Sequence, residues 1–170
     1  GTGSVIVNVQ TDGSLGLVGI SFAWGLVVAA LIYIFGPVSG THINPAVTIS
    51  LAIGGLMPKK EVFGYLLTQV LGAIVASALL KILFPETETM GGTMPSGSVL
   101  QSFVLEFIMT FILLLTVLGI TAKKETEHLT GLVVGLVIVA IILFAGPISG
   151  ASINPARSIG PAVVAGNLHN

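Results

Sequence analysis

The sequence contains one eleven-residue motif twice, with the two copies 110 residues apart. The first copy, GPVSGTHINPA, runs from Gly36 to Ala46, and the second, GPISGASINPA, runs from Gly146 to Ala156. An internal repeat constrains the architecture before any single residue does. Each copy follows a long apolar run and places Asn-Pro before an apolar stretch too short to cross a bilayer. Paired interrupted segments in the two halves of a membrane protein indicate a shared site near the midplane.

The composition is that of a chain that lies in lipid. Hydrophobic residues make up 54% of the 170 residues, charged residues make up 8%, and the mean hydropathy is +1.06. A soluble domain of this size could not hide so much apolar surface from water. The net charge of −1 gives no basic surface for nucleic acid. There is no cysteine, and the histidines and acidic residues lack metal-ligand spacing, so we expect no metal and no cofactor.

Four apolar runs are long enough to span a membrane, because a helix crosses a hydrocarbon core of ~30 Å in ~20 residues. These runs cover approximately residues 15–35, 62–84, 99–121 and 129–145. Lys59 and Lys60 precede the second run, and Lys123 and Lys124 follow the third. The positive-inside rule places both lysine pairs in the cytoplasm. The two copies of the motif therefore enter the membrane from opposite faces.

The predicted fold class is all-α and integral to the membrane, with an inverted repeat inside one channel domain of residues 1–170. The first repeat covers approximately residues 1–84 with its Asn-Pro-Ala box at 44–46. The second covers approximately residues 98–170 with its box at 154–156.

The two boxes predict a pair of half-helices. Pro45 and Pro155 suit the first turn of a helix, where the missing N–H is not needed. The runs that follow are about ten residues long, which gives ~15 Å of helix, or half a bilayer. Two such half-helices would meet near the midplane and bring Asn44 and Asn154 together. Non-helical backbone at that depth is tolerated only where it is buried in protein or lines a water-filled cavity, so we predict a pore.

The group types at this centre predict its chemistry. Each Asn carboxamide offers N–H donors at the positive end of a half-helix dipole. The Gly-Pro-Val/Ile-Ser-Gly segments before the boxes are expected to be strands that expose carbonyl acceptors. A central water held by two donors would point its own hydrogens away, and the positive field would repel cations and hydronium. The alternative is that Asn44 and Asn154 only cap their helices.

These residues resemble the major intrinsic protein family of aquaporins and glycerol facilitators. The resemblance rests on the two boxes, the continuation of the second as Arg157-Ser158, the stretch from Gln69 to Ala76, and Glu106. It covers nearly the whole chain and implies six spanning helices and two half-helices. Most of the first spanning helix and all of the last are then expected to be missing here. It also implies a homotetramer, with a pore in each subunit, in the plasma membrane or an inner cell membrane.

The resemblance further implies an outer constriction, the aromatic/arginine filter, at Trp24, Ile142, Ala151 and Arg157. This quartet is similar to that of the nodulin-like intrinsic proteins. Water-selective members of the family have His at the position of Ile142. An apolar side chain there, with the small Ala151 opposite Trp24, predicts a wider and partly apolar constriction. The alternatives are that Trp24 belongs to an interfacial aromatic belt and that Ile142 faces lipid or an apolar core.

Four other residues are candidates for supporting roles. Glu106 lies in an otherwise uncharged run, where a central charge costs roughly 2.5 to 3.5 kcal/mol. The resemblance makes it a brace for the loop of the second box, whereas a transporter would use it as a proton relay. His42 resembles a pore-facing histidine of the inner vestibule, with a purely structural role as the alternative. Gly40 and Gly150 are expected to line or support the pore.

The function expected from this sequence is passive conduction of water and small neutral solutes such as glycerol, with exclusion of protons and ions. Urea, ammonia and uncharged metalloid acids are further candidate solutes. Ser158 stands where glycerol facilitators usually carry Asp, and Ala162 also resembles the residue that aquaporins have at its position. A strictly water-selective channel is therefore an alternative. An ion-coupled secondary transporter is an alternative of another class. No nucleophile, acid-base pair or phosphate-binding loop stands out in the sequence, so we do not expect an enzyme.

Overall fold

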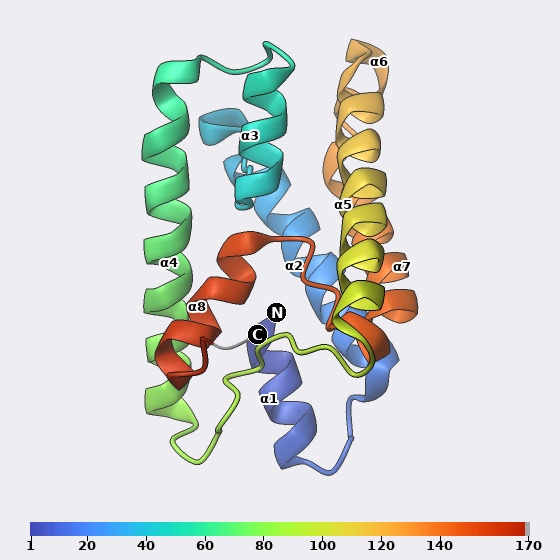
Figure 1. Cartoon of the computed structure of the whole chain (residues 1–170). Coiled ribbons are helices and arrows are strands. Elements are labelled where there is room, and N and C mark those ends of the chain that lie inside the picture. Colours follow the sequence, from blue (N-terminus) through green and yellow to red (C-terminus); the bar gives the residue numbers. More distant parts are fainter. Residues whose placement is uncertain (169–170) are drawn as a thin grey trace.

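The computed structural model of the chain describes residues 1–168, so that residues 169 and 170 of the expected second repeat lie outside the described residues. The described part is helical and contains no strand (Figure 1). Its elements are α1 (Thr2–Gln10), α2 (Gly16–Ser39), α3 (Pro45–Ile53), the 3₁₀ turn η1 (Lys59–Glu61), α4 (Val62–Leu83), α5 (Val99–Thr121), α6 (Lys124–Glu127), α7 (Thr130–Ser149) and α8 (Pro155–Ala165).

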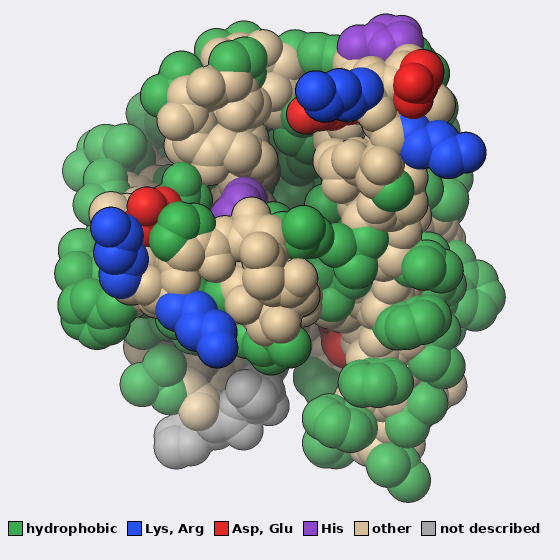
Figure 2. Space-filling view, turned by 90° about the horizontal axis from the view of Figure 1, so that it is seen from above, with side chains coloured by type: hydrophobic (Ala, Val, Ile, Leu, Met, Phe, Trp, Pro, Cys, Tyr) green, Lys and Arg blue, Asp and Glu red, His purple; other side chains and the backbone are tan. Residues whose placement is uncertain are grey.

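The four predicted spans are confirmed as long apolar helices. Helices α2, α5 and α7, and the continuous segment of η1 and α4, are each long and apolar enough to cross a membrane. Hydrophobic side chains cover the flanks of the bundle, and charged side chains gather at the end that carries η1 and α6 (Figure 2). Both lysine pairs are exposed at this same end, as the predicted orientation requires.

The ends of α2 and α7 correct one expectation. The Gly-Pro-Val/Ile-Ser-Gly segments were expected to be strands before the boxes, but they form the last helical turns, as far as Ser39 and Ser149. Proline has a helical φ, but it cannot donate to the carbonyl four residues earlier and its ring crowds that carbonyl, so each helix ends two residues after its proline. Each helix ends at a left-handed glycine, with φ of 69° at Gly40 and 81° at Gly150.

The half-helices α3 and α8 begin at the two prolines and contain 9 and 11 residues. In Figure 1, α3 lies in the upper half of the bundle and α8 in the lower half. The N-terminal ends of the two contact each other through their boxes. Each is supported by a spanning helix, since α4 packs against both α3 and α8.

The two repeats are joined mainly where α2 packs along α7. Gly25 and Gly135, which are 110 residues apart like the boxes, face each other at this crossing. A Cβ added to Gly25 would lie 2.5 Å from the carbonyl oxygen of Gly135, and one added to Gly135 would lie 2.7 Å from that of Gly25. The absence of side chains therefore sets how closely the two helices approach. This contact holds the box-bearing loops of both repeats side by side.

Candidate functional site

The side chains of Asn44 and Asn154 exchange hydrogen bonds with the backbone of the opposite repeat. Asn44 Nδ2 donates to the carbonyl oxygen of Ile153 at 2.7 Å, and Asn154 Nδ2 donates to that of Ile43 at 2.8 Å. Asn44 is buried, with 5% of its surface exposed, and Asn154 is partly buried. The centre of the bundle is therefore a two-fold arrangement of two amides and two carbonyls.

Both asparagines also cap their own half-helices, as the alternative interpretation held. Asn44 Oδ1 accepts from the backbone N–H of Ala46 at 2.9 Å, and Asn154 Oδ1 accepts from that of Ala156 at 3.1 Å. Capping uses the amide oxygen and directs the amino group away from the helix. One N–H of each amino group takes part in the exchange between repeats, and each amino group has a second N–H. Capping thus presents the donors, and not the acceptors, to a molecule at the centre.

The loops before the boxes contain strained backbone that the sequence did not reveal. Thr41 and Ile43 have φ of 47° and 40°, and the equivalent Ala151 and Ile153 have φ of 46° and 45°. A side chain in the left-handed region costs roughly 1–2 kcal/mol, so such residues persist only where their surroundings hold them. The conformation is the same in both repeats, which points to a shared requirement on the direction of the carbonyls.

Glu106 of α5 holds the second of these loops. Its Oε1 accepts from Ser149 Oγ at 2.6 Å and from the backbone N–H of Ser152 at 2.8 Å. Its Oε2 accepts from the backbone N–H of Ile153 at 2.7 Å. A carboxylate that accepts from three donors fixes the backbone of this loop, whose Ile153 carbonyl accepts from Asn44.

His42 joins a polar cluster on the first repeat. Its Nδ1 lies 3.1 Å from Thr48 Oγ1, which also accepts from Gln69 Nε2 at 2.8 Å. The ring of His42 lies 5.0 Å from that of Tyr65, measured between centroids. A Cβ at Gly40 would come within 3.0 Å of the histidine ring, so glycine gives this ring its room. The sequence did not indicate Thr48 or Tyr65, because hydroxyl groups on apolar helices carry no spacing signal.

Trp24 and Arg157 are in contact. The guanidinium carbon of Arg157 lies 5.0 Å from the centroid of the Trp24 ring, within the range of a cation–π interaction. Only 8% of the surface of Arg157 is exposed, and its Nη1 is buried with no hydrogen-bond partner among residues 1–168. Its position in the first turn of α8, three residues after Asn154, places this charge beside the central amides.

The other two filter candidates share a cavity with Trp24 and both asparagines. Ile142 and Ala151 are buried and line this cavity, whose volume is about 430 Å³. Ile142 therefore faces the interior and not lipid. Arg157 lines an adjoining cavity of about 750 Å³ that also reaches Trp24 and Asn154. The structure thus brings Trp24 and Arg157 together and places all four candidates on two cavities that share Trp24 and Asn154 in their lining.

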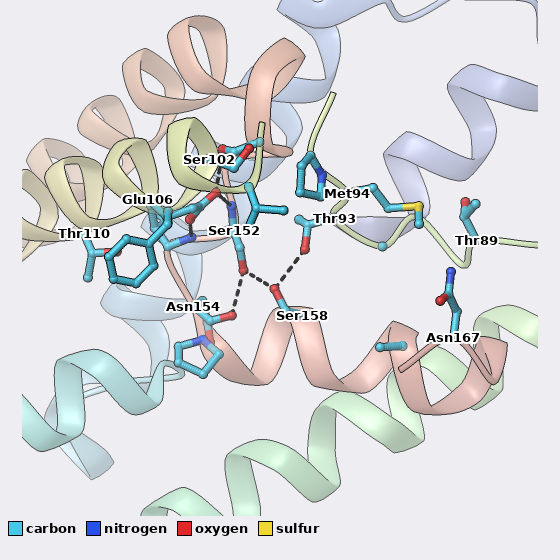
Figure 3. A pocket seen from close by; sticks show the side chains of 18 of the residues that line it. Thr89, Thr93, Met94, Ser102, Glu106, Thr110, Ser152, Asn154, Ser158 and Asn167 are labelled. Atoms are coloured by element: carbon cyan, nitrogen blue, oxygen red, sulfur yellow. Dashed lines mark hydrogen bonds between the residues drawn. The ribbon is translucent and has the colours of Figure 1, made fainter. Parts of the chain in front are cut away.

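A third cavity, of about 420 Å³, lies on the other side of the second box (Figure 3). Glu106, Ser152 and Ser158 point into it, together with Thr93 from the connection between α4 and α5. Three hydroxyl groups there form a continuous chain of hydrogen bonds. Thr93 could not be identified from the sequence, because this connection has neither a periodic pattern nor a counterpart in the other repeat.

Comparison with known proteins agrees with this geometry. Residues 1–170 match the family described as "Major intrinsic protein". "Aquaporin NIP1-2" of Arabidopsis thaliana is 45% identical, over 96% of this chain and 59% of its own length. "Aquaporin NIP1-1" of Zea mays is 44% identical, over 98% and 60%. The chain thus spans about three fifths of the length of these relatives.

A solved structure shows the same fold. The X-ray structure of the aquaglyceroporin from Plasmodium falciparum superposes with a TM-score of 0.79 at 28% identity, over 88% of this chain and 67% of that one. The predicted resemblance to aquaporins of the nodulin-like type is confirmed, and members of this family are channels, not enzymes. With a match over its full length and relatives more than 40% identical, the chain belongs to the major intrinsic protein family.

Proposed function

We propose that the protein is a passive transmembrane channel for water and small neutral solutes such as glycerol, and that it excludes protons and other ions. The observation that carries this proposal is the reciprocal exchange between Asn44, Asn154 and the carbonyls of the opposite repeat. It fixes two amide donors at the meeting point of two half-helices. In one channel domain of this kind, both repeats serve a single path.

Exclusion of protons follows from the direction of the donors. A water molecule that accepts hydrogen bonds from both amides must point its own hydrogens outward, which interrupts a chain of hydrogen bonds that could carry a proton. The positive ends of α3 and α8 also disfavour hydronium and cations at this position. The charge of Arg157 adds to the same barrier.

Selection among neutral solutes is assigned to Trp24, Ile142, Ala151 and Arg157. Arg157 has a buried Nη1 that can donate to a hydroxyl group, and the indole and isoleucine side chains can contact carbon. The small Ala151 leaves width between them. The relatives named as NIP aquaporins and the aquaglyceroporin structure support this solute range.

The engagement of Glu106 disfavours an ion-coupled transporter. A proton relay needs a carboxylate that is free to exchange partners during each cycle, and here both oxygens of Glu106 are engaged by three donors of the second box's loop. We assign Glu106, Gly40 and Gly150 to support of the pore loops, and His42 to the wall of the pore.

The membrane setting belongs to the same proposal. The protein would act as a homotetramer with a pore in each subunit, in the plasma membrane or an inner cell membrane. Broad apolar outer faces on α4 and α5, which include Phe63, Phe103 and Phe107, support contact with lipid or with neighbouring subunits.

Osmotic flux through proteoliposomes that carry the full-length protein tests the function. In a sucrose gradient the vesicles should shrink faster than empty ones, and in a glycerol gradient they should shrink and then swell again. Ile142→Trp should block both fluxes because the side chain faces the cavity, whereas Leu143→Trp, on the exposed face of α7, should not.

Three results would each reject part of the proposal. Shrinkage no faster than in empty vesicles would reject the channel. Fast shrinkage without swelling in glycerol would leave a water-selective channel and reject the solute range. Flux that saturates and requires an ion gradient would favour the transporter.

A further inference from the structure

We propose that Thr93 is a positioning residue for the selectivity filter, which acts through Ser158 and Ser152 on the loop and helix that carry Ala151 and Arg157. This inference rests on the proposed function and assigns a role to the connection between α4 and α5. The connection spans residues 84–98 and crosses the site from outside both repeats (Figures 1 and 3).

The contact is a chain of three hydroxyl groups that ends on a backbone carbonyl (Figure 3). Thr93 Oγ1 lies 2.9 Å from Ser158 Oγ, and Ser158 Oγ lies 2.6 Å from Ser152 Oγ. Ser152 Oγ donates to the carbonyl oxygen of Asn154 at 2.9 Å. Thr93 is therefore linked through side chains to the pore-centre residue Asn154.

The direction in which each hydroxyl of this chain donates follows from the single proton that each hydroxyl carries. A carbonyl oxygen only accepts, so Ser152 donates its single hydroxyl proton to the carbonyl oxygen of Asn154. Ser152 must then accept from Ser158, and Ser158 must accept from Thr93. Thr93 is the first donor, and the orientation of both serine hydroxyls depends on it.

Both serines are next to a filter residue in the sequence. Ser152 follows Ala151, and its backbone N–H is one of the donors to Glu106. Ser158 follows Arg157 in the first turn of α8, and its backbone N–H donates to the carbonyl of Asn154 at 3.2 Å. The hydroxyl chain therefore restrains the two residues that adjoin Ala151 and Arg157 in the backbone.

Thr93 is itself held in place. A Cβ at Gly150 would lie 2.8 Å from Thr93 Cγ2 and 3.0 Å from Thr93 Cα, so the threonine packs directly on that glycine. Three residues later, the backbone N–H of Ser96 donates to the carbonyl of Ile148 at 2.9 Å. Met90, three residues earlier, is fully buried. The connection is thus fastened on both sides of Thr93 and can transmit its position to the filter.

The test compares variants of the full-length protein in proteoliposomes and in detergent. Thr93→Val removes the first donor at nearly constant shape, Thr93→Ser restores it, and Ser158→Ala breaks the chain in the middle. Thr89→Val is the matched control, because Thr89 is an exposed residue of the same connection whose hydroxyl makes no hydrogen bond within the described residues. The measurements are the ratio of glycerol to water permeability and the ¹⁹F spectrum of Trp24 labelled as 5-fluorotryptophan.

Loss of one hydrogen bond changes an equilibrium about fivefold, so we expect Thr93→Val to change the permeability ratio by about that factor. The ¹⁹F resonance of Trp24 should shift, because the indole lies 5.0 Å from the guanidinium carbon of Arg157. Thr93→Ser and Thr89→Val should match the wild type. The double variant of Thr93→Val and Ser158→Ala should match Ser158→Ala alone, since both substitutions act through one chain.

Each contrary result overturns the positioning role. A Thr93→Val protein with the wild-type ratio and resonance would do so, as would additive effects in the double variant. Equal loss of water and glycerol flux in proportion to the amount of folded protein would show a merely structural role. The ¹⁹F measurement does not need flux, so it decides the inference even where the wild type fails to conduct glycerol and the proposed solute range is rejected.

Discussion

Replacement of Glu106 distinguishes its two possible roles, as a brace for the loop of the second box and as a proton relay. In the structure the carboxylate is an acceptor for three donors of the second pore loop, namely Ser149 Oγ and the backbone N–H groups of Ser152 and Ile153. If the loop depends on these bonds, both Glu106→Gln and Glu106→Ala should destabilise the protein, and the alanine variant should do so more.

The expected losses in the free energy of unfolding follow from how the three hydrogen bonds are divided between the two oxygens of Glu106. Oε1 accepts two of the bonds and Oε2 accepts one, from Ile153. A glutamine with its carbonyl oxygen at the Oε1 position keeps two acceptor contacts and turns its NH₂ group toward the N–H of Ile153. Hydrogen bonds to charged groups contribute ~1.5–3 kcal/mol each, so we expect a loss of about 2–3 kcal/mol for glutamine. Alanine loses all three bonds, and we expect about 4–6 kcal/mol.

Unfolding of the full-length protein in detergent, followed by thermal or denaturant midpoint, measures these losses. Thr110→Val is the control, because Thr110 lies one turn further along α5, lines the same cavity and makes no side-chain hydrogen bond within the described residues. Its midpoint should stay close to that of the wild type. A Glu106→Gln protein with unchanged stability, and with flux that has lost a dependence on the pH gradient, would refute the brace and favour the relay.

Three further substitutions test the packing and the filter. Gly135→Ala should destabilise by about 1–3 kcal/mol in the same unfolding assay, because its Cβ would lie 2.7 Å from the carbonyl oxygen of Gly25, whereas Gly119→Ala meets open space and should not. Equal unfolding midpoints for Gly135→Ala and Gly119→Ala would show that α2 and α7 can move apart without loss of stability. Arg157→Ala should raise cation leak through proteoliposomes about 100-fold. The positive charge of Arg157 repels a monovalent cation about 5 Å away by about 3 kcal/mol at an effective dielectric constant of 20. Unchanged ion exclusion would remove Arg157 from the barrier. Ile142→His should lower glycerol flux relative to water by about tenfold through a narrower and more polar constriction, and an unchanged ratio would mean that Ile142 does not limit solute size.

The repeat explains how much of the fold was predictable. Two copies of one motif fixed the pairing of the boxes, and apolar runs fixed the four spans, because both signals are carried by many residues at once. The ends of α2 and α7 lie about one turn beyond the expected spans, because the segments that contain Pro37 and Pro147 were expected to be strands and are helical. The positions of Asn44 and Asn154 in the repeat were sufficient to predict that the two residues lie close together. The left-handed φ of Thr41 could not be predicted, because threonine is not a residue type that favours this conformation.

Contacts between side chains of different elements were invisible in the sequence for a different reason. Thr93 touches the site by tertiary packing alone, and the polar cluster of His42, Thr48 and Gln69 depends on how closely α3 approaches α4. A hydroxyl group on an apolar helix is usually satisfied by its own backbone, as Ser77 and Thr116 are here. Only the folded structure distinguishes such hydroxyls from those that bond across elements.

The repeat also separates what is symmetric in the pore from what is not. The hydrogen bonds from amide to carbonyl, the left-handed loop residues and the glycines of the helix crossing all occur in pairs, at an offset of 110 residues. The same offset relates Arg157 to Val47 and Trp24 to Val134, and both valines line the 430 Å³ cavity that also reaches Trp24. Equivalent positions of the two repeats thus carry a charge and an indole in one pairing and two valines in the other. In the proposed channel, the symmetric centre would orient water whichever way it moves, whereas discrimination by charge and ring contact would depend on Arg157 and Trp24, so substitutions at these two residues should change which solutes pass more than substitutions at Val47 and Val134 do.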